Sequence, residues 1–98
     1  MRIEDIKELV LSACKKYNVK RLDVFGSSAR GDEKNPRDLD FLVEFHKPDY
    51  LPSKRFFGLL HYLEDTTDCP IDLVSINGVR NPFFLNRIMK ERKNVYEG

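Results

Sequence analysis

The segment from Asp38 to Phe45 constrains the fold more than any other part of this 98-residue chain. It is an apolar run with acidic side chains at alternate positions near its start, which is typical of a β-strand. Side chains two residues apart on a strand point to the same face, so Asp38 and Asp40 lie side by side. Because two neighbouring carboxylates repel each other, we predict that the pair binds a cation rather than stabilising the fold.

The region before this strand is predicted to contain one helix, one strand and a turn. Residues 3–17 carry apolar side chains at intervals of three and four, the pattern of an amphipathic helix. Asn18 tolerates a left-handed backbone and is predicted to end that helix. Residues 21–25 then have strand character and run into a glycine-rich turn that begins at Gly26.

The region after the strand is predicted to contain two more helices and two short strands. The first is a helix over 53–66 with Ser53 as its candidate N-cap, and a strand over 71–76 follows it. The second helix has Asn81 as N-cap and Pro82 at its first position. A short strand at Val95 and Tyr96 comes last. The apolar side of the last helix is assigned to Phe83, Phe84, Leu85, Ile88 and Met89. The predicted order is α-β-(turn)-β-α-β-α-(β), an α/β fold in one domain over residues 1–98.

Composition excludes several classes of protein. The chain is 41% hydrophobic and 34% charged, the balance of a globular domain. Its net charge of +1 excludes a protein that binds a polyanion by bulk charge, so long nucleic acid is not the expected partner. No apolar run approaches the roughly 20 residues of a membrane span, and the N-terminus has no signal-peptide pattern. Cys14 and Cys69 are interpreted as small packed residues rather than a disulfide, and the expected compartment is the cytoplasm.

The turn that precedes the acidic strand has the composition of a phosphate-binding loop. Gly26 permits close approach of the backbone, Ser27 and Ser28 offer hydroxyl donors, and backbone N–H groups of such a turn bind phosphate oxygens. Arg30 adds a fork-shaped cation that matches phosphate geometry. A phosphate-binding turn beside a pair of metal-binding acids is the arrangement of a nucleoside triphosphate site.

A third acid, Asp72, stands near the start of the next apolar strand. If that strand lies beside the one that begins at Asp38, Asp72 completes a triad with Asp38 and Asp40. Three carboxylates can hold two metal ions roughly 4 Å apart, as in-line phosphoryl displacement requires.

Taken together, the glycine-rich turn over 26–31 and the Asp38-Leu39-Asp40 sequence resemble the signature of the DNA-polymerase-β-like nucleotidyltransferases. The length and element order are similar to the minimal nucleotidyltransferases, the antitoxins that pair with HEPN ribonuclease toxins. The resemblance implies a small mixed sheet flanked by helices, Mg²⁺ (two ions), and ATP or another nucleoside triphosphate as substrate. In one respect the chain departs from the family: Arg37 stands where Ser usually precedes the first acid, which removes no metal ligand.

The resemblance also assigns roles to the motif residues. Gly26 and Ser27 would bind the triphosphate together with Ser28, and Arg30 would contact phosphate or support the loop. Asp38 and Asp40 would ligate both metals. Asp72 would ligate the catalytic metal and help to activate the acceptor hydroxyl.

Other interpretations remain open at this point. The two acids of the strand can be a solvated strand end, Ser27 a helix cap, Arg30 a surface ion pair and Asp72 an edge-facing surface acid. The leading hypothesis is a nucleotidyltransferase that modifies a hydroxyl of a HEPN-type toxin. The alternatives are a binding module that occludes its partner with a slow or unused nucleotide site, and transfer to a nucleic acid or small molecule.

Overall fold

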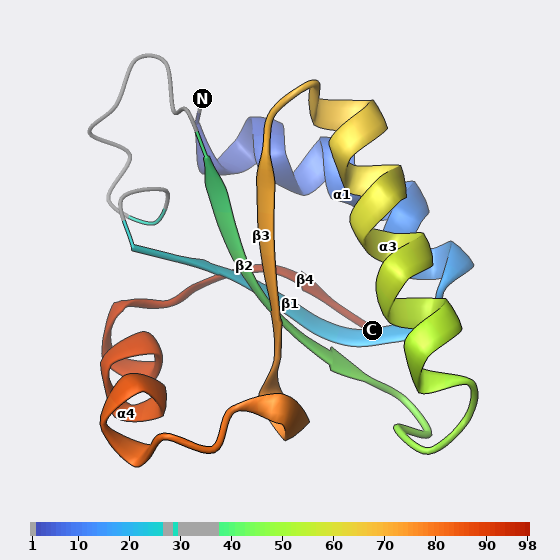
Figure 1. Cartoon of the computed structure of the whole chain (residues 1–98). Coiled ribbons are helices and arrows are strands. Elements are labelled where there is room, and N and C mark those ends of the chain that lie inside the picture. Colours follow the sequence, from blue (N-terminus) through green and yellow to red (C-terminus); the bar gives the residue numbers. More distant parts are fainter. Residues whose placement is uncertain (1, 27–28, 30–37) are drawn as a thin grey trace.

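A computed structural model describes residues 2–26, 29 and 38–98 (Figure 1). Three of the predicted nucleotide-binding residues lie outside the described residues, namely Ser27, Ser28 and Arg30. Arg37, at which the chain departs from the family pattern, also lies outside them. The elements are α1 (Ile3–Lys16), β1 (Val19–Phe25), β2 (Leu39–Phe45), α3 (Pro52–Thr67), β3 (Ile71–Ser75), the 3₁₀ turn η1 (Ile76–Gly78), α4 (Pro82–Glu91) and β4 (Lys93–Glu97). This order confirms the predicted α/β fold.

The strands form one mixed sheet in the order β3-β2-β1-β4. Strand β1 is antiparallel to both of its neighbours, whereas β2 and β3 are parallel. The parallel pair is joined through α3, the crossover that parallel strands require. Strand β3 is therefore an edge strand whose start lies beside the start of β2, as the sequence argument for Asp72 required.

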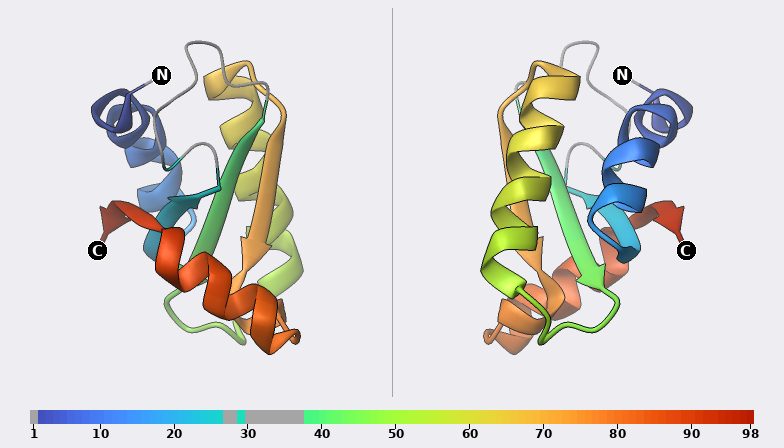
Figure 2. Two further views of the ribbon diagram at one scale, coloured as in Figure 1. Left: turned by 90° about the vertical axis from the view of Figure 1, so that its left-hand side faces the viewer. Right: turned by 90° about the vertical axis from the view of Figure 1, so that its right-hand side faces the viewer.

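Helices cover the two faces of the sheet unequally. In the right-hand panel of Figure 2, α1 and α3 lie in front of the strands and α4 lies behind them. The α1/α3 face holds a continuous apolar core in which residues such as Val10, Phe41 and Leu59 are fully buried. On the α4 face the buried cluster is Phe25, Leu42 and Ile88. The α4 face thus has less apolar cover and more room for polar groups.

Most helix ends agree with the sequence predictions. Asn18 has a φ of 55° and follows Tyr17, the C-cap of the helix that it was predicted to end. The Asn81 side chain accepts hydrogen bonds from the backbone N–H groups of Phe83 (3.0 Å) and Phe84 (3.3 Å), which confirms it as the N-cap of α4. Strand β3 stops one residue earlier than predicted, because Ile76 begins the 3₁₀ turn.

Two expectations about the helices were wrong. Ser53 does not cap α3, because the helix begins at Pro52 and its N-cap is Leu51, in a left-handed conformation without a side-chain cap. The apolar residues of α4 do not form one buried side. Ile88 is buried, but Phe83 is 83% exposed, and Phe84 and Met89 are also exposed.

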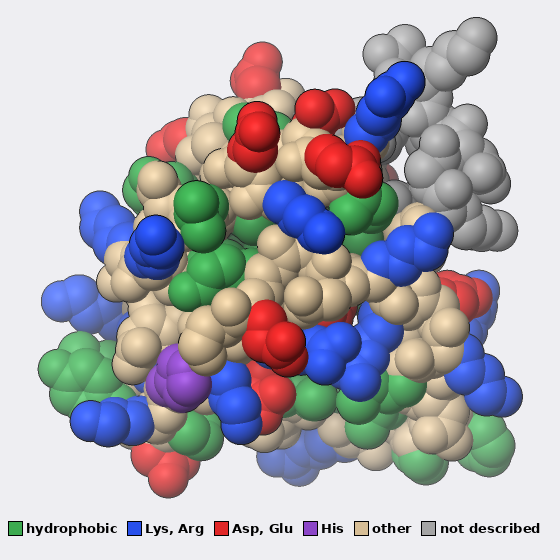
Figure 3. All heavy atoms as spheres, turned by 180° about the vertical axis from the view of Figure 1, so that it is seen from behind, with side chains coloured by type: hydrophobic (Ala, Val, Ile, Leu, Met, Phe, Trp, Pro, Cys, Tyr) green, Lys and Arg blue, Asp and Glu red, His purple; other side chains and the backbone are tan. Residues whose placement is uncertain are grey.

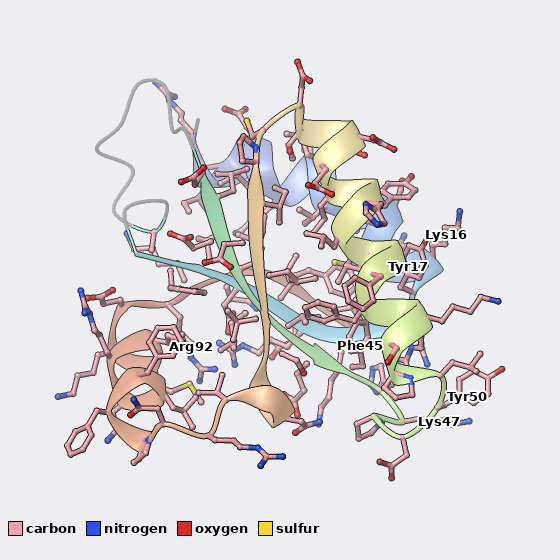
Figure 4. All side chains as sticks on the ribbon, viewed as in Figure 1. Lys16, Tyr17, Phe45, Lys47, Tyr50 and Arg92 are labelled. Atoms are coloured by element: carbon pink, nitrogen blue, oxygen red, sulfur yellow. The ribbon has the colours of Figure 1, made fainter. Side chains whose placement is uncertain are left out.

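A buried arginine of α3 fixes the end of the sheet that lies far from the three acids. Arg55 donates from all three guanidinium nitrogens to five backbone carbonyls, at 2.6–3.2 Å, which belong to Tyr17, Asn18, His46, Lys47 and Tyr50. Its guanidinium also lies 4.5 Å from the centre of the Phe45 ring. Figure 4 shows Tyr17, Phe45, Lys47 and Tyr50 gathered near the start of α3.

These carbonyls come from two loops with unusual backbones. Asn18, Lys47 and Leu51 all have positive φ, at 55°, 48° and 44°. Such conformations are costly for residues other than glycine, and they persist where surrounding contacts hold them. The bonds from Arg55 tie both loops to α3 and supply those contacts.

A second buried charge lies on the α4 face. Asp23 is 1% exposed and receives hydrogen bonds from Arg21 at 3.0 Å, from Asn94 at 3.0 Å and from Arg92 at 3.3 Å. Arg92 is the C-cap of α4, and it lies beside that helix in Figure 4. Asp23 therefore connects β1 to the junction between α4 and β4 and helps to fix the position of α4.

The surface carries both signs of charge. Seen from behind, Lys and Arg side chains are interspersed with Asp and Glu (Figure 3). This mixture agrees with the net charge of +1. Across the described residues, every helix is too short or too polar to cross a bilayer.

Candidate active site

The parallel register of β2 and β3 brings the predicted acids to one end of the sheet. Asp40 of β2 is paired directly with Asp72 of β3. Their strand neighbours Leu39 and Leu73 belong to the core on the α1/α3 face, so alternation turns the two acids toward the α4 face. Asp38 lies one residue before β2 and is exposed. The structure therefore brings the three predicted carboxylates together.

The electrostatics of Asp40 reflect its burial and the two neighbouring acids. Partial burial raises the pKa of the Asp40 carboxyl, and the negative charges of Asp72 and Asp38 raise it further. Each cause disfavours the ionised form of the carboxyl. A bound cation would reverse this effect, because it stabilises the carboxylates that otherwise repel one another.

Gly26 lies against the same carboxylate. It follows β1, whose last residue, Phe25, is paired with Asp40. A Cβ atom at Gly26 would lie 2.9 Å from Asp40 Oδ2, and the φ of Gly26 is +65°. The positive φ favours glycine because another residue would strain the backbone, and a Cβ atom here would force the Asp40 carboxylate to shift. The start of the glycine-rich turn is thus adjacent to the acids, as the sequence predicted.

A pocket of about 260 Å³ opens at this point, between the end of the sheet and α4. Gly26, Asp40 and Asp72 line one side of it. The other lining residues are Phe25, Phe84, Arg87, Ile88 and Glu91. The Phe84 ring packs edge-on against Phe25, with 6.4 Å between the ring centres. The pocket therefore combines carboxylates, a glycine turn, an exposed aromatic ring and a cation.

The acids fit a magnesium ion that is held jointly with a substrate. Carboxylate oxygens are the ligands that Mg²⁺ prefers, and Mg²⁺ is usually bound by one or two carboxylates together with substrate phosphates and water. Within the described ranges, no three His, Cys, Asp or Glu side chains are arranged to hold a metal ion by themselves. The carboxylate donors of Asp38, Asp40 and Asp72 fit an ion completed by phosphate oxygens.

Sequence reasoning did not find the α4 side of the pocket. Arg87 and Glu91 were not singled out, because isolated charges on a short helix are most often solvated. One signal was available: two adjacent aromatic residues, Phe83 and Phe84, cannot both lie on the buried stripe of a helix. That pair indicated that one side of α4 faces something other than the core.

Comparison with known proteins agrees with this geometry. The chain matches the family described as "Polymerase beta, Nucleotidyltransferase" over residues 6–98. One relative is a Methanocaldococcus jannaschii protein that is provisionally named a protein adenylyltransferase. The two chains are 37% identical over 94 residues, and the match covers 91% of this chain and 93% of that protein. This chain is 34% identical over 87 residues to the protein adenylyltransferase MntA of Thermococcus cleftensis, covering 83% and 84% of the two chains.

Solved structures show the same fold. One, provisionally described as a minimal nucleotidyltransferase, superposes with a TM-score of 0.76 at 31% identity and covers 95% of both chains. A toxin–antitoxin structure with AMP-PNP has a TM-score of 0.75 at 17% identity, covering 94% of this chain and 73% of that one. A complex of a tri-AMPylated Shewanella oneidensis HEPN toxin with an MNT antitoxin has a TM-score of 0.71 at 15% identity, covering 99% and 74%. At such identities the last two show the fold alone.

Proposed function

Because this chain belongs to the polymerase-β nucleotidyltransferase family, we propose that it transfers the adenylyl group of ATP to a hydroxyl of a partner protein, most directly a HEPN-type toxin. The observation that carries the proposal is the pairing of Asp40 with Asp72 beside Gly26 in one pocket. Two relatives over 30% identical bear the name of protein adenylyltransferase, and a solved complex of this fold contains an AMPylated toxin.

We assign the glycine turn and the acids different roles in this reaction. The backbone at Gly26, which has no side chain in the way, permits the phosphate chain to approach Asp40 closely. Asp40 and Asp38, together with Asp72, would hold Mg²⁺, which when bound neutralises charge on the phosphate oxygens. The family pattern suggests that Ser27, Ser28 and Arg30 contribute to the same phosphate site.

The chemical step is an in-line displacement at the α-phosphorus of ATP. The acceptor oxygen forms a bond to that phosphorus, the bond to the bridging oxygen of pyrophosphate breaks, and pyrophosphate leaves. The hydroxyl proton must depart as the new bond forms. Asp72 lines the pocket and is exposed, so we assign it, beside its metal-ligand role, to help to remove that proton from an acceptor presented from outside. Because ATP is made and consumed inside cells, we place the reaction in the cytoplasm.

The test is the mass of a candidate toxin after incubation with this protein, ATP and Mg²⁺. We expect the toxin to gain one or more adenylyl groups with the wild type and none with Asp38→Asn/Asp40→Asn. Asp49→Asn, which removes an exposed acid of the loop between β2 and α3, is the matched control and should act like the wild type. A panel of HEPN-type toxins that stays unmodified while ATP binds normally would contradict the proposed acceptor.

The second candidate is neutralisation by binding alone. The exposed aromatic side chains Phe57 and Phe83 favour it, because large exposed apolar groups mark partner surfaces. The same double Asn variant separates the two functions. If it still forms the complex and still neutralises the toxin, occlusion is sufficient; if the complex forms but the toxin stays active, chemistry is required.

A further inference from the structure

Helix α4 brings one cation to the wall of the pocket that faces the acids. Among the described lining residues, Arg87 is the only positively charged one, and Asp40, Asp72 and Glu91 are acidic. Ile88 is buried beneath the helix, and Phe84 packs against Phe25. Arg87 and Glu91 are therefore the polar groups that α4 presents to a ligand.

The present partner of Arg87 holds it weakly. Arg87 Nε lies 3.7 Å from Glu91 Oε1, one helical turn away, which is long for a hydrogen bond. The two side chains are 77% and 41% exposed. Exposed pairs at this spacing contribute little to stability, so Arg87 can exchange Glu91 for another anion at small cost.

We propose that Arg87 binds the phosphate chain of the nucleotide, and that Glu91 keeps its guanidinium beside the pocket until the nucleotide arrives. This inference rests on the proposed function, because it takes the pocket to be the ATP site. A triphosphate is highly anionic, and the acids on the sheet side reach it only through a cation. Arg87 approaches from the opposite wall, and its planar fork can donate two parallel hydrogen bonds to phosphate oxygens.

The test is titration of ATP with Mg²⁺ into the full chain. Hydrogen bonds to a charged group are strong, so Arg87→Gln is expected to weaken ATP binding about tenfold or more. Arg87→Lys keeps the charge but loses the fork, and we expect an intermediate loss. Lys90→Gln removes an exposed cation of α4 outside the pocket and is the matched control, with an expected change below twofold. Glu91→Gln removes the anion that competes with phosphate for Arg87, and we expect it to bind ATP more tightly than the wild type.

The outcomes separate this inference from the proposed function. Equal losses in Arg87→Gln and Lys90→Gln would overturn it, because the effect would then be one of general charge. If Asp38→Asn/Asp40→Asn abolishes binding while Arg87→Gln leaves it unchanged, the inference fails and the proposed function stands. A wild type that binds no ATP in the presence of Mg²⁺ would overturn both. Because Arg87 is exposed, its variants are expected to melt at the wild-type temperature, which a thermal scan checks.

Discussion

The two faces of the sheet differ in what their side chains do. Every strand sends alternate residues to opposite faces, so β2 buries Leu39, Phe41 and Val43 under α1 and α3 and turns Asp40 toward α4. The first face is a continuous apolar core. The second has a small buried cluster around Ile88 and an open pocket at one end.

This difference shows how a small chain accommodates repelling charges. Asp23 also lies on the α4 face, but arginine and asparagine side chains satisfy it and it is fully buried. Asp40 has Asp72 and Asp38 near it; partial burial raises the pKa of Asp40, and the charges of these two acids raise it further. The repulsion among these acids destabilises the fold, so the apolar core on the α1/α3 face has to provide the stability that offsets it. We therefore expect substitutions on the α1/α3 face to change stability, and substitutions at the acids to change activity.

The largest expected effect is on the α1/α3 face. Leu59 is fully buried between α3 and the sheet, and Leu59→Ala removes that packing and leaves a cavity. We expect a loss of about 3 kcal/mol in the free energy of unfolding, measured by urea denaturation. Leu11→Ala is the matched control, because Leu11 is 43% exposed in α1. A similar loss in both variants would contradict the assignment of stability to this core.

The next effect is on activity and not on stability. Asp72→Asn removes one of the proposed metal ligands, and we expect adenylyl transfer to fall about a hundredfold, measured as the initial rate of toxin modification. The free energy of unfolding should stay the same or rise slightly, because a charge that repels Asp40 is removed. Asp49→Asn should change neither quantity. A destabilised Asp72→Asn protein would mean that this acid is a structural group.

Much of this division could be read from the sequence. The alternation of Asp38, Asp40 and the apolar residues between them predicted a strand with acids on one face, and the strand context of Asp72 predicted its place beside them. Gly26 was predicted to allow close approach, and the structure agrees, because a Cβ atom at Gly26 would lie 2.9 Å from Asp40 Oδ2. These features are local: each depends on the period of a strand or on the shape of one turn.

The remainder depended on contacts between segments distant in the sequence. Arg55 stands within an ordinary helical pattern, and nothing near it shows that five carbonyls from two loops converge on its side chain. Asp23 belongs to the strand predicted over 21–25, but its partners Arg92 and Asn94 come from the other end of the chain. Arg87 and Glu91 join the pocket only because α4 packs behind the sheet.

A smaller loss of stability is expected at Arg55. Arg55→Lys retains a positive charge but loses the planar group that reaches five carbonyls and stacks on Phe45. Several of those carbonyls can turn to water, so we expect the free energy of unfolding to fall by about 2 kcal/mol. Arg80→Lys, at an exposed position before α4, is the control and should melt like the wild type. Since Arg55 lies at the far end of the sheet, ATP affinity below the melting temperature should not change, and a change would show that the two ends are coupled.

The smallest effect is expected at the start of α4, a helix whose substitution can change both stability and nucleotide binding. Asn81→Ala removes the side-chain oxygen that accepts from the N–H groups of Phe83 and Phe84, and we expect a loss of about 1 kcal/mol in the free energy of unfolding. Asn81→Asp keeps an acceptor at the same position and should restore most of that loss. Hydrogen exchange of the α4 amides, measured with both variants, checks whether the loss is confined to this helix.

If the Ala variant frays α4, ATP affinity should fall with it, because α4 carries one wall of the pocket. Normal ATP affinity with a frayed α4 would show that the sheet side of the pocket binds the nucleotide by itself.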